Sequence, residues 1–136
     1  MIIVCDTNVL ISALIFPGGI PDKIVRSFFS GRFQNATSPD ILTELRRNLQ
    51  RILDVDKQQT ESLASLITQS SHLIYPTERL TVVKHDDAVN RIIECALAAK
   101  AECLITGDKK HLLPIKVYEG IAILSPREFA TKFGVI

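Results

Sequence analysis

Two short apolar runs, one near each end of the chain, each lead to an aspartate. Residues 2–5 (IIVC) directly precede Asp6, and residues 103–105 (CLI) are followed by Thr106, Gly107 and Asp108. Continuous apolar runs of this length are typical of strands buried on both faces of a parallel sheet. Ligands of open α/β sheets bind at the carboxyl ends of the strands. The two runs therefore predict a buried sheet with Asp6 and Asp108 at one edge.

The segments between these runs alternate between helical and extended patterns. Helices are predicted from Asn8 to Leu14, Asp22 to about Gly31, Ser38 to about Ile52, Asp56 to about Ser70, Ala88 to Lys100, and from Ser125 onward. Further strands are predicted at residues 33–36, 72–75 and 121–124, the last within 117–124. Ser38 before Pro39 and the capping-box residues Ser125 and Glu128 mark two helix starts. This order predicts an α/β domain with a parallel sheet covered on both faces.

Length and composition bound the class of protein. A chain of 136 residues predicts a single domain, residues 1–136, and 46% hydrophobic residues argue against disorder. No apolar run approaches the roughly 20 residues of a transmembrane helix, and no signal peptide is read at the start. Three cysteines without zinc-site spacing indicate buried thiols in a reducing cytoplasm. The net charge of +1 decides nothing about a polyanionic partner.

Several acids could meet Asp6 and Asp108 at the sheet edge. Mg²⁺ and Mn²⁺ prefer oxygen ligands, and two such ions can activate a water and hold a leaving oxygen. Glu44 lies on a predicted helix beside inward-facing Leu45, although, taken alone, a surface position explains it better. Asp6 and Asp86 or Asp87 could instead cap helices, and Asp108 could be an ordinary turn residue. Gly107 is expected to let the chain turn sharply before Asp108.

Two helical residues share a face with Asp87. Asn90 and Glu94 follow it at spacings i+3 and i+7, so all three are expected on one side of the helix. Asp86 and Glu94 are the alternatives to Asp87 as a ligand. Thr7, Asn8 and Thr106 are polar neighbours that could orient carboxylates or a water. The candidate contacts for a polyanion, against the simpler interpretation of solvated surface charge, are Arg46, Arg47, Arg51, Lys109, Lys110 and His111.

Two motifs resemble the PIN-domain family of nucleases, in particular the toxin components of toxin–antitoxin pairs. The family's hydrophobic strand, Asp-Thr-Asn and apolar helix match residues 2–12 (IIVCDTNVLIS). Its Ala-rich helix, strand and Thr-Gly-Asp match residues 94–108 (ECALAAKAECLITGD), and its middle glutamate falls on Glu44. The resemblance extends from Met1 to about Leu124.

The resemblance implies a three-layer α/β/α sandwich with a mainly parallel sheet, Mg²⁺ or Mn²⁺ at an acidic site, and hydrolysis of RNA. It implies a homodimer held inactive by a cognate antitoxin. The implied catalytic and metal-binding acids are Asp6, Glu44 and Asp108. Read from the residues themselves, Asp87 is the hypothesised fourth acid, Thr7, Asn8, Asn90 and Thr106 are the supporting residues, and Arg46, Arg47, Lys109 and Lys110 are the candidate substrate contacts.

One position departs from the family pattern. The family places its third acid seven residues before the alanine that is Ala96 here, which falls on Val89. Valine cannot bind a metal, so Asp87 is the hypothesised replacement.

Rival classes fit less well. A PIN domain with a weakened site would be an RNA- or protein-binding module. A haloacid-dehalogenase phosphotransferase would need a second aspartate where Asn8 stands, and a receiver domain would need an acidic pair before a later phosphoacceptor. A dinucleotide-binding domain would need a Gly-x-Gly-x-x-Gly after the first strand, which is lacking.

Overall fold

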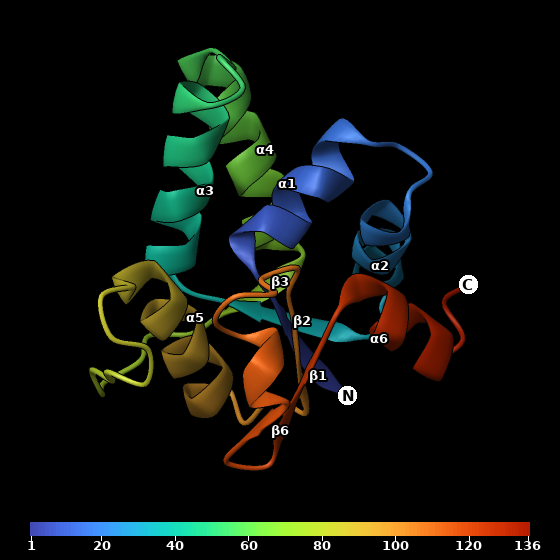
Figure 1. The fold of residues 1–136 in the computed structure, drawn as a ribbon. Helices are drawn as coiled ribbons and strands as arrows, with labels where there is room; N and C mark the ends of the chain where they lie inside the picture. The colour runs from blue at the N-terminus through green and yellow to red at the C-terminus, as the bar shows by residue number, and fades with distance from the viewer.

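A mostly parallel sheet of six strands runs through the molecule, in the order β3-β2-β1-β4-β6-β5 (Figure 1). The structure is a computed structural model that describes residues 1–136. The strands are β1 (Ile2–Cys5), β2 (Gln34–Thr37), β3 (Ser71–Leu73), β4 (Cys103–Ile105), β5 (Val117–Tyr118) and β6 (Ile121–Leu124). All neighbouring strands pair in parallel except β5 and β6. The predicted α/β fold with a mainly parallel sheet is confirmed.

Helices flank this sheet on both sides. They are α1 (Thr7–Ile15), α2 (Ile20–Phe29), α3 (Pro39–Arg51), α4 (Lys57–Gln69), α5 (Asp87–Ala98) and α6 (Pro126–Lys132), with a 3₁₀ turn η1 (Leu113–Ile115). In Figure 1, α5 lies on one side of the sheet and α2 and α6 lie on the other, while α3 and α4 run side by side away from it. No single helix is long and apolar enough to cross a membrane. Taken together, α1 and α2 have the length and composition of a span, but they are bent by 101° to each other.

Side-chain caps begin most of these helices where the sequence places them. The Ser38 hydroxyl accepts a hydrogen bond from the backbone N–H of Ile41 at 3.3 Å, and Ser125 and Glu128 form the predicted capping box. Such caps satisfy N–H groups that the first helical turn leaves unpaired. α2 begins at Ile20, two residues before the predicted Asp22, because Pro21 fits its first turn.

The segment 117–124 forms a hairpin, where the sequence indicated a single strand. Glu119 and Gly120 connect β5 to β6 with φ angles of 49° and 81°. Two successive positive φ values are the mark of a type I′ hairpin turn. Glutamate is an uncommon first residue for that turn, which is why the sequence did not reveal β5.

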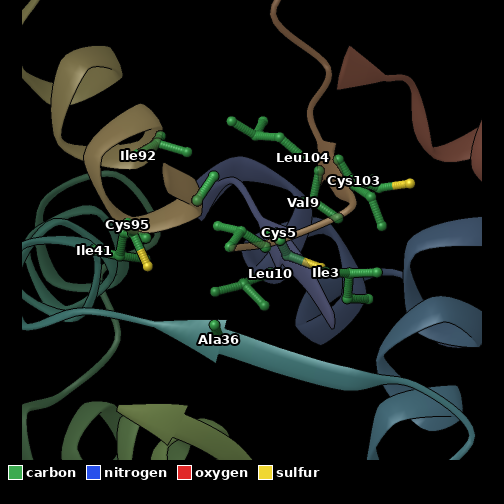
Figure 2. Close-up of a cluster of buried hydrophobic side chains, with 14 of the residues drawn as sticks. Ile3, Cys5, Val9, Leu10, Ala36, Ile41, Ile92, Cys95, Cys103 and Leu104 are labelled. Atoms are coloured by element: carbon green, nitrogen blue, oxygen red, sulfur yellow. The ribbon is translucent and has the colours of Figure 1, made fainter. Parts of the chain in front are cut away.

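The hydrophobic core packs the central strands against the helices, and Figure 2 shows the part of it where β1, β2 and β4 meet α1, α3 and α5. The thiols of Cys5, Cys95 and Cys103 are buried and unpaired, as the composition indicated. Burial raises the pKa of the Cys5 and Cys95 thiols to about 12. These cysteines therefore act as small apolar side chains rather than as nucleophiles.

The order in which strands are added to the sheet reverses between β1 and β4. From β1 the chain goes to β2 and β3 on one side, and it then returns to β4 on the other side. Cys5 pairs with Ile105, and the backbone N–H of Asp6 donates to the carbonyl of Ile105 at 2.9 Å. Such a topological switch point is where α/β sheets leave a crevice for ligands. It places the residues after β1 and β4 next to one another.

Candidate functional site

A cleft of about 410 Å³ opens at this switch point and is lined by four carboxylates. Asp6 directly follows β1, Asp108 lies three residues after the end of β4, Glu44 comes from α3, and Asp86 is the N-cap of α5. These four residues are far apart in the sequence, and the sheet edge brings them to one place. We call this cavity the acid cleft.

One threonine hydroxyl connects the two strand-end aspartates. Thr106 Oγ1 donates to Asp6 Oδ2 at 2.6 Å and accepts from the backbone N–H of Asp108 at 3.0 Å. Thr106 is fully buried and Asp6 is 5% exposed. The short charge-assisted bond fixes the rotamer of Asp6 and the backbone of Asp108 relative to each other. The proximity of these two acids is therefore built into the fold.

Asp6 also caps α1, so its structural and functional interpretations hold together. Its Oδ1 accepts from the backbone N–H of Asn8 at 3.4 Å. Burial raises the pKa of Asp6, the charge of Asp108 adds to the increase, and the hydrogen bonds from Thr106 and Asn8 oppose it. The folded chain thus holds a carboxylate whose ionised form is poorly solvated. A nearby cation would stabilise that ionised form.

Asp108 is held by the backbone that follows it. Its Oδ1 accepts from the N–H groups of Lys110 and His111, both at 3.0 Å. Gly107 does not take a left-handed conformation, and a Cβ built there would meet no atom within 4 Å. A left-handed φ is therefore not the reason for glycine at this position. Gly107 leaves open space at the cleft wall instead.

The helix phase decides which of the two adjacent aspartates enters the cleft. Asp86 Oδ1 caps Val89 N–H at 3.2 Å, and Val89 itself lines the cleft. Residues three apart share a helix face, so Asp86 lies on the face of Val89. Asp87 lines an adjoining cavity instead. His111 Nδ1 lies 3.2 Å from Asp86 Oδ2 and 3.7 Å from Asp108 Oδ2, between the two acids.

Asn90 and Glu94 are turned away from the acid cleft. They contact residues 74–86, the loop between β3 and α5, which we call the strap. The Asn90 side chain accepts from the N–H of Val83 at 2.8 Å and donates to its carbonyl at 2.7 Å. Glu94 accepts from the N–H of Leu80 at 2.7 Å. The shared face expected from their spacing exists, but it packs against the strap.

Two arginines complete this attachment. Arg91 pairs with Glu94 at 2.7 Å and donates to the Leu80 carbonyl at 3.1 Å. Arg79, on the strap itself, lies 3.4 Å from Glu94 and 3.4 Å from Asp40 of α3. Glu94 is 2% exposed, so these cations neutralise a buried charge. The contacts of Glu94 are those of a residue that positions the strap.

The predicted cationic contacts separate into two groups. Arg47 pairs with Glu44 at 3.0 Å and lines the cavity that adjoins the acid cleft, and Lys110 lines the acid cleft. Arg46 pairs with Glu61 of α4 at 3.0 Å and, like Lys109, lines neither cavity.

Among the lining residues that the sequence did not indicate, three carry the side chains that matter most to the two cavities. Asn48 lines the acid cleft, and its spacing of four from Glu44 was a usable signal, because such residues share a helix face. Arg79 and Arg91 line the adjoining cavity. No local pattern indicates either arginine.

Comparison with known proteins gives the family. Residues 2–110 match the family model described as PIN domain. The chain belongs to the PIN domain family. This PIN domain is 34% identical over 145 residues to an uncharacterized protein of Methanocaldococcus jannaschii, covering 96% of this chain and 90% of that protein. Its fold is similar to a chain of the crystal structure of VapBC2 from Rickettsia felis bound to a DNA fragment from their promoter, with a TM-score of 0.66, 16% identity, and 92% and 98% of the two chains covered.

The residue types of the acid cleft of this PIN domain fit a hard divalent cation. Four carboxylates from separate elements line it, and oxygen ligands are what Mg²⁺ and Mn²⁺ prefer. The Thr7 hydroxyl is buried without a hydrogen-bond partner and belongs to a residue that lines both cavities. No three His, Cys, Asp or Glu side chains stand close enough to hold one ion as they lie. Coordination would therefore require the acids to leave their present internal partners.

Proposed function

We propose that this PIN domain is a metal-dependent ribonuclease that hydrolyses RNA phosphodiesters in the acid cleft. The observation that supports the proposal is the meeting of Asp6, Glu44, Asp86 and Asp108 in one cavity at the switch point of the sheet. A phosphodiester brings a negative charge to a site already rich in carboxylates. A bound cation would make that combination favourable, and this cleft offers the oxygen ligands for one.

The proposed roles follow from the contacts of each residue. Asp6, Glu44, Asp86 and Asp108 would hold Mg²⁺ or Mn²⁺. When bound, such ions activate a water for in-line attack and stabilise the leaving oxygen. Thr106 keeps Asp6 and Asp108 in fixed relative positions through its hydroxyl. Asn48 and Lys110, which line the same cleft, would contact the substrate.

We extend the proposal to the biological setting by resemblance. The motifs are similar to those of toxin components of toxin–antitoxin pairs, and the VapBC2 chain has a similar fold. On this basis we expect a cytoplasmic toxin that forms a homodimer and is held inactive by a cognate antitoxin. Copurification with the product of an adjacent gene, and the mass of the purified chain in solution, test these two expectations.

Cleavage of a mixed RNA substrate tests the activity itself. The purified protein is incubated with Mn²⁺, Mg²⁺ or EDTA, beside the variants Asp6→Asn and Asp86→Asn. Asp56→Asn is the matched control, because Asp56 caps α4 outside both cavities and asparagine caps helices equally well. We expect cutting that requires metal, is lost in the first two variants and persists in the control. Cutting that continues in EDTA, or in Asp6→Asn, would contradict the proposal.

Val89 supports a second candidate, a PIN domain with a weakened site that acts as an RNA- or protein-binding module. This residue lines the acid cleft at the position where the family pattern has an acid. The variant Val89→Asp would add a carboxylate on the face of Asp86. Cutting by Val89→Asp alone, with RNA binding but no cutting by the unmodified protein, would establish the binding module. Cutting by the unmodified protein would exclude it.

A further inference from the structure

A second cavity of about 270 Å³ lies beside the acid cleft and is lined by three arginines. Arg47 comes from α3, Arg79 from the strap and Arg91 from α5, and we call this cavity the arginine groove. It is continuous with the acid cleft, because Thr7 and Glu44 line both. A chain molecule with its reacting group in the acid cleft could therefore extend into the arginine groove.

The arginines retain hydrogen-bond donors that the protein does not use. Each guanidinium has five N–H groups, and Arg47 and Arg79 each use a single terminal nitrogen, Nη1, in their contacts. The Arg79 side chain is 64% exposed and both of its contacts are long, at 3.4 Å. The Nε of Arg91 is buried without any partner. Free forks of this kind match the two oxygens of a phosphate.

Carboxylates also line the groove, and the charge balance must allow for them. Asp40, Glu44 and Asp87 are lining residues, so the groove by itself is near neutrality. Glu44, however, is shared with the acid cleft. If the Glu44 side chain rotates to bind a cation there, as the proposed function requires, Arg47 loses its partner. The net charge of the arginine groove then becomes positive. Loading of the acid cleft would thus prepare the neighbouring groove for an anion.

We propose that the arginine groove binds the backbone phosphate next to the scissile one in single-stranded RNA, with Arg47 and Arg79 as its contacts. Arg91 supports them by neutralising Glu94 and holding the strap. This inference rests on the proposed ribonuclease function, since it assumes RNA in the acid cleft. It assigns the strap a role in substrate binding, because the strap carries Arg79 over the groove to Asp40.

The salt dependence of RNA binding tests this subsite. The probe is a fluorescent single-stranded oligoribonucleotide, and the protein keeps all four acids of the cleft and is loaded with Ca²⁺, which also takes oxygen ligands. A gel after each titration verifies that the probe is intact. Arg47→Ala, Arg79→Ala, their combination and Arg79→Lys are compared on this background. Arg26→Ala is the matched control, an exposed arginine on α2 that pairs with Asp22 outside both cavities. Circular dichroism verifies that each variant is folded.

Loss of this one phosphate contact should reduce the slope of log K against log salt by about 0.7. The double variant should therefore lose about 0.7 in slope, which is roughly 5-fold in affinity at 0.1 M salt relative to 1 M salt, and each single variant should lose no more than that. Arg79→Lys should keep the slope but bind more weakly, since a lysine retains the charge without the fork. Arg26→Ala should match the parent.

Two results separate this inference from the proposed function. Cutting of RNA by the unmodified protein, with an unchanged salt slope in the double variant, would overturn the arginine groove and leave the ribonuclease intact. Absence of cutting, with the predicted loss of slope, would overturn the ribonuclease and leave the phosphate subsite standing.

Discussion

Replacing Thr106 by valine removes one hydroxyl group while keeping the shape of a fully buried side chain. In the folded protein this hydroxyl donates to Asp6 Oδ2 at 2.6 Å and accepts from the Asp108 N–H at 3.0 Å. The substitution deletes a charge-assisted bond and leaves a backbone N–H without its partner. No other contact of the side chain changes, because valine replaces the hydroxyl with a methyl group of similar size.

The expected loss of stability follows from these two bonds. A hydrogen bond to a charged group contributes about 1.5–3 kcal/mol, and an unsatisfied buried N–H costs about 1–3 kcal/mol. Partial relaxation toward water reduces their sum, so we expect a loss of about 3 kcal/mol at pH 7. For 136 residues the unfolding entropy is about 0.29 kcal/mol/K, which makes the corresponding fall in melting temperature roughly 10 °C.

The loss should depend on pH in a defined direction. Burial raises the pKa of Asp6 above its ordinary value of 3.8. Stability from this group is therefore complete below about pH 3.8 and declines as the pH rises through its folded-state pKa. The Thr106 bond opposes that decline, because it lowers the pKa. Thr106→Val should consequently lose more stability at pH 7 than at pH 3, where the bond joins two neutral groups.

Urea unfolding at pH 7 and at pH 3, with Thr106→Ser as the control, measures both effects. Serine keeps the hydroxyl and loses only a methyl group. Thr106→Ser should therefore retain most of the free energy of unfolding that Thr106→Val loses at pH 7. Equal losses in Thr106→Val and Thr106→Ser would refute the argument, because the methyl group and not the hydrogen bonds would then be responsible. A loss that does not depend on pH would refute the assignment to the Asp6 carboxylate.

Three further predictions concern other parts of the site and the core. Calorimetric titration should show that Mn²⁺ affinity falls at least about ten-fold in Asp86→Asn, because a metal-site residue is lost. In Asp87→Asn the affinity should fall less than about two-fold. The reverse order would move the third ligand back to Asp87. Asn90→Ala should lower the free energy of unfolding in urea by about 2 kcal/mol and increase hydrogen exchange of the strap, because both hydrogen bonds from the Asn90 side chain to the Val83 backbone disappear. Unchanged exchange would contradict the strap attachment. With a pKa of about 12, Cys5 and Cys95 should resist iodoacetamide at pH 8 until the protein unfolds, and labelling of the native protein would contradict their burial.

Positions fixed by a strand end could be predicted from the sequence. Asp6 and Asp108 follow apolar runs that only a buried strand explains, and parallel strands deliver their carboxyl ends to one edge. The same logic located Thr106, although its hydroxyl could not be shown to connect the two acids. The order of β1 and β4 as neighbours depends on chain crossovers, which no local pattern encodes.

Positions fixed by helix phase and by loops could not be predicted in the same way. Asp86 and Asp87 differ by one residue, which is a rotation of about 100° around α5, and the sequence does not state where the helix starts to that accuracy. Asn90 and Glu94 have the spacing of a ligand pair, but a polar face can equally be buried against a loop. The strap that covers this face has no periodic pattern of its own.

Each acid of the cleft has a partner from the same protein. Asp6 is bonded to Thr106, Glu44 is paired with Arg47, and His111 stands between Asp86 and Asp108. Without such partners, several carboxylates around one cavity would repel each other and oppose folding. Under the proposed function, binding of a cation is therefore an exchange, in which the ion replaces internal donors. Its affinity is the difference between the new ligand bonds and the contacts given up, so the residues that keep the empty cleft stable also set how tightly it is loaded.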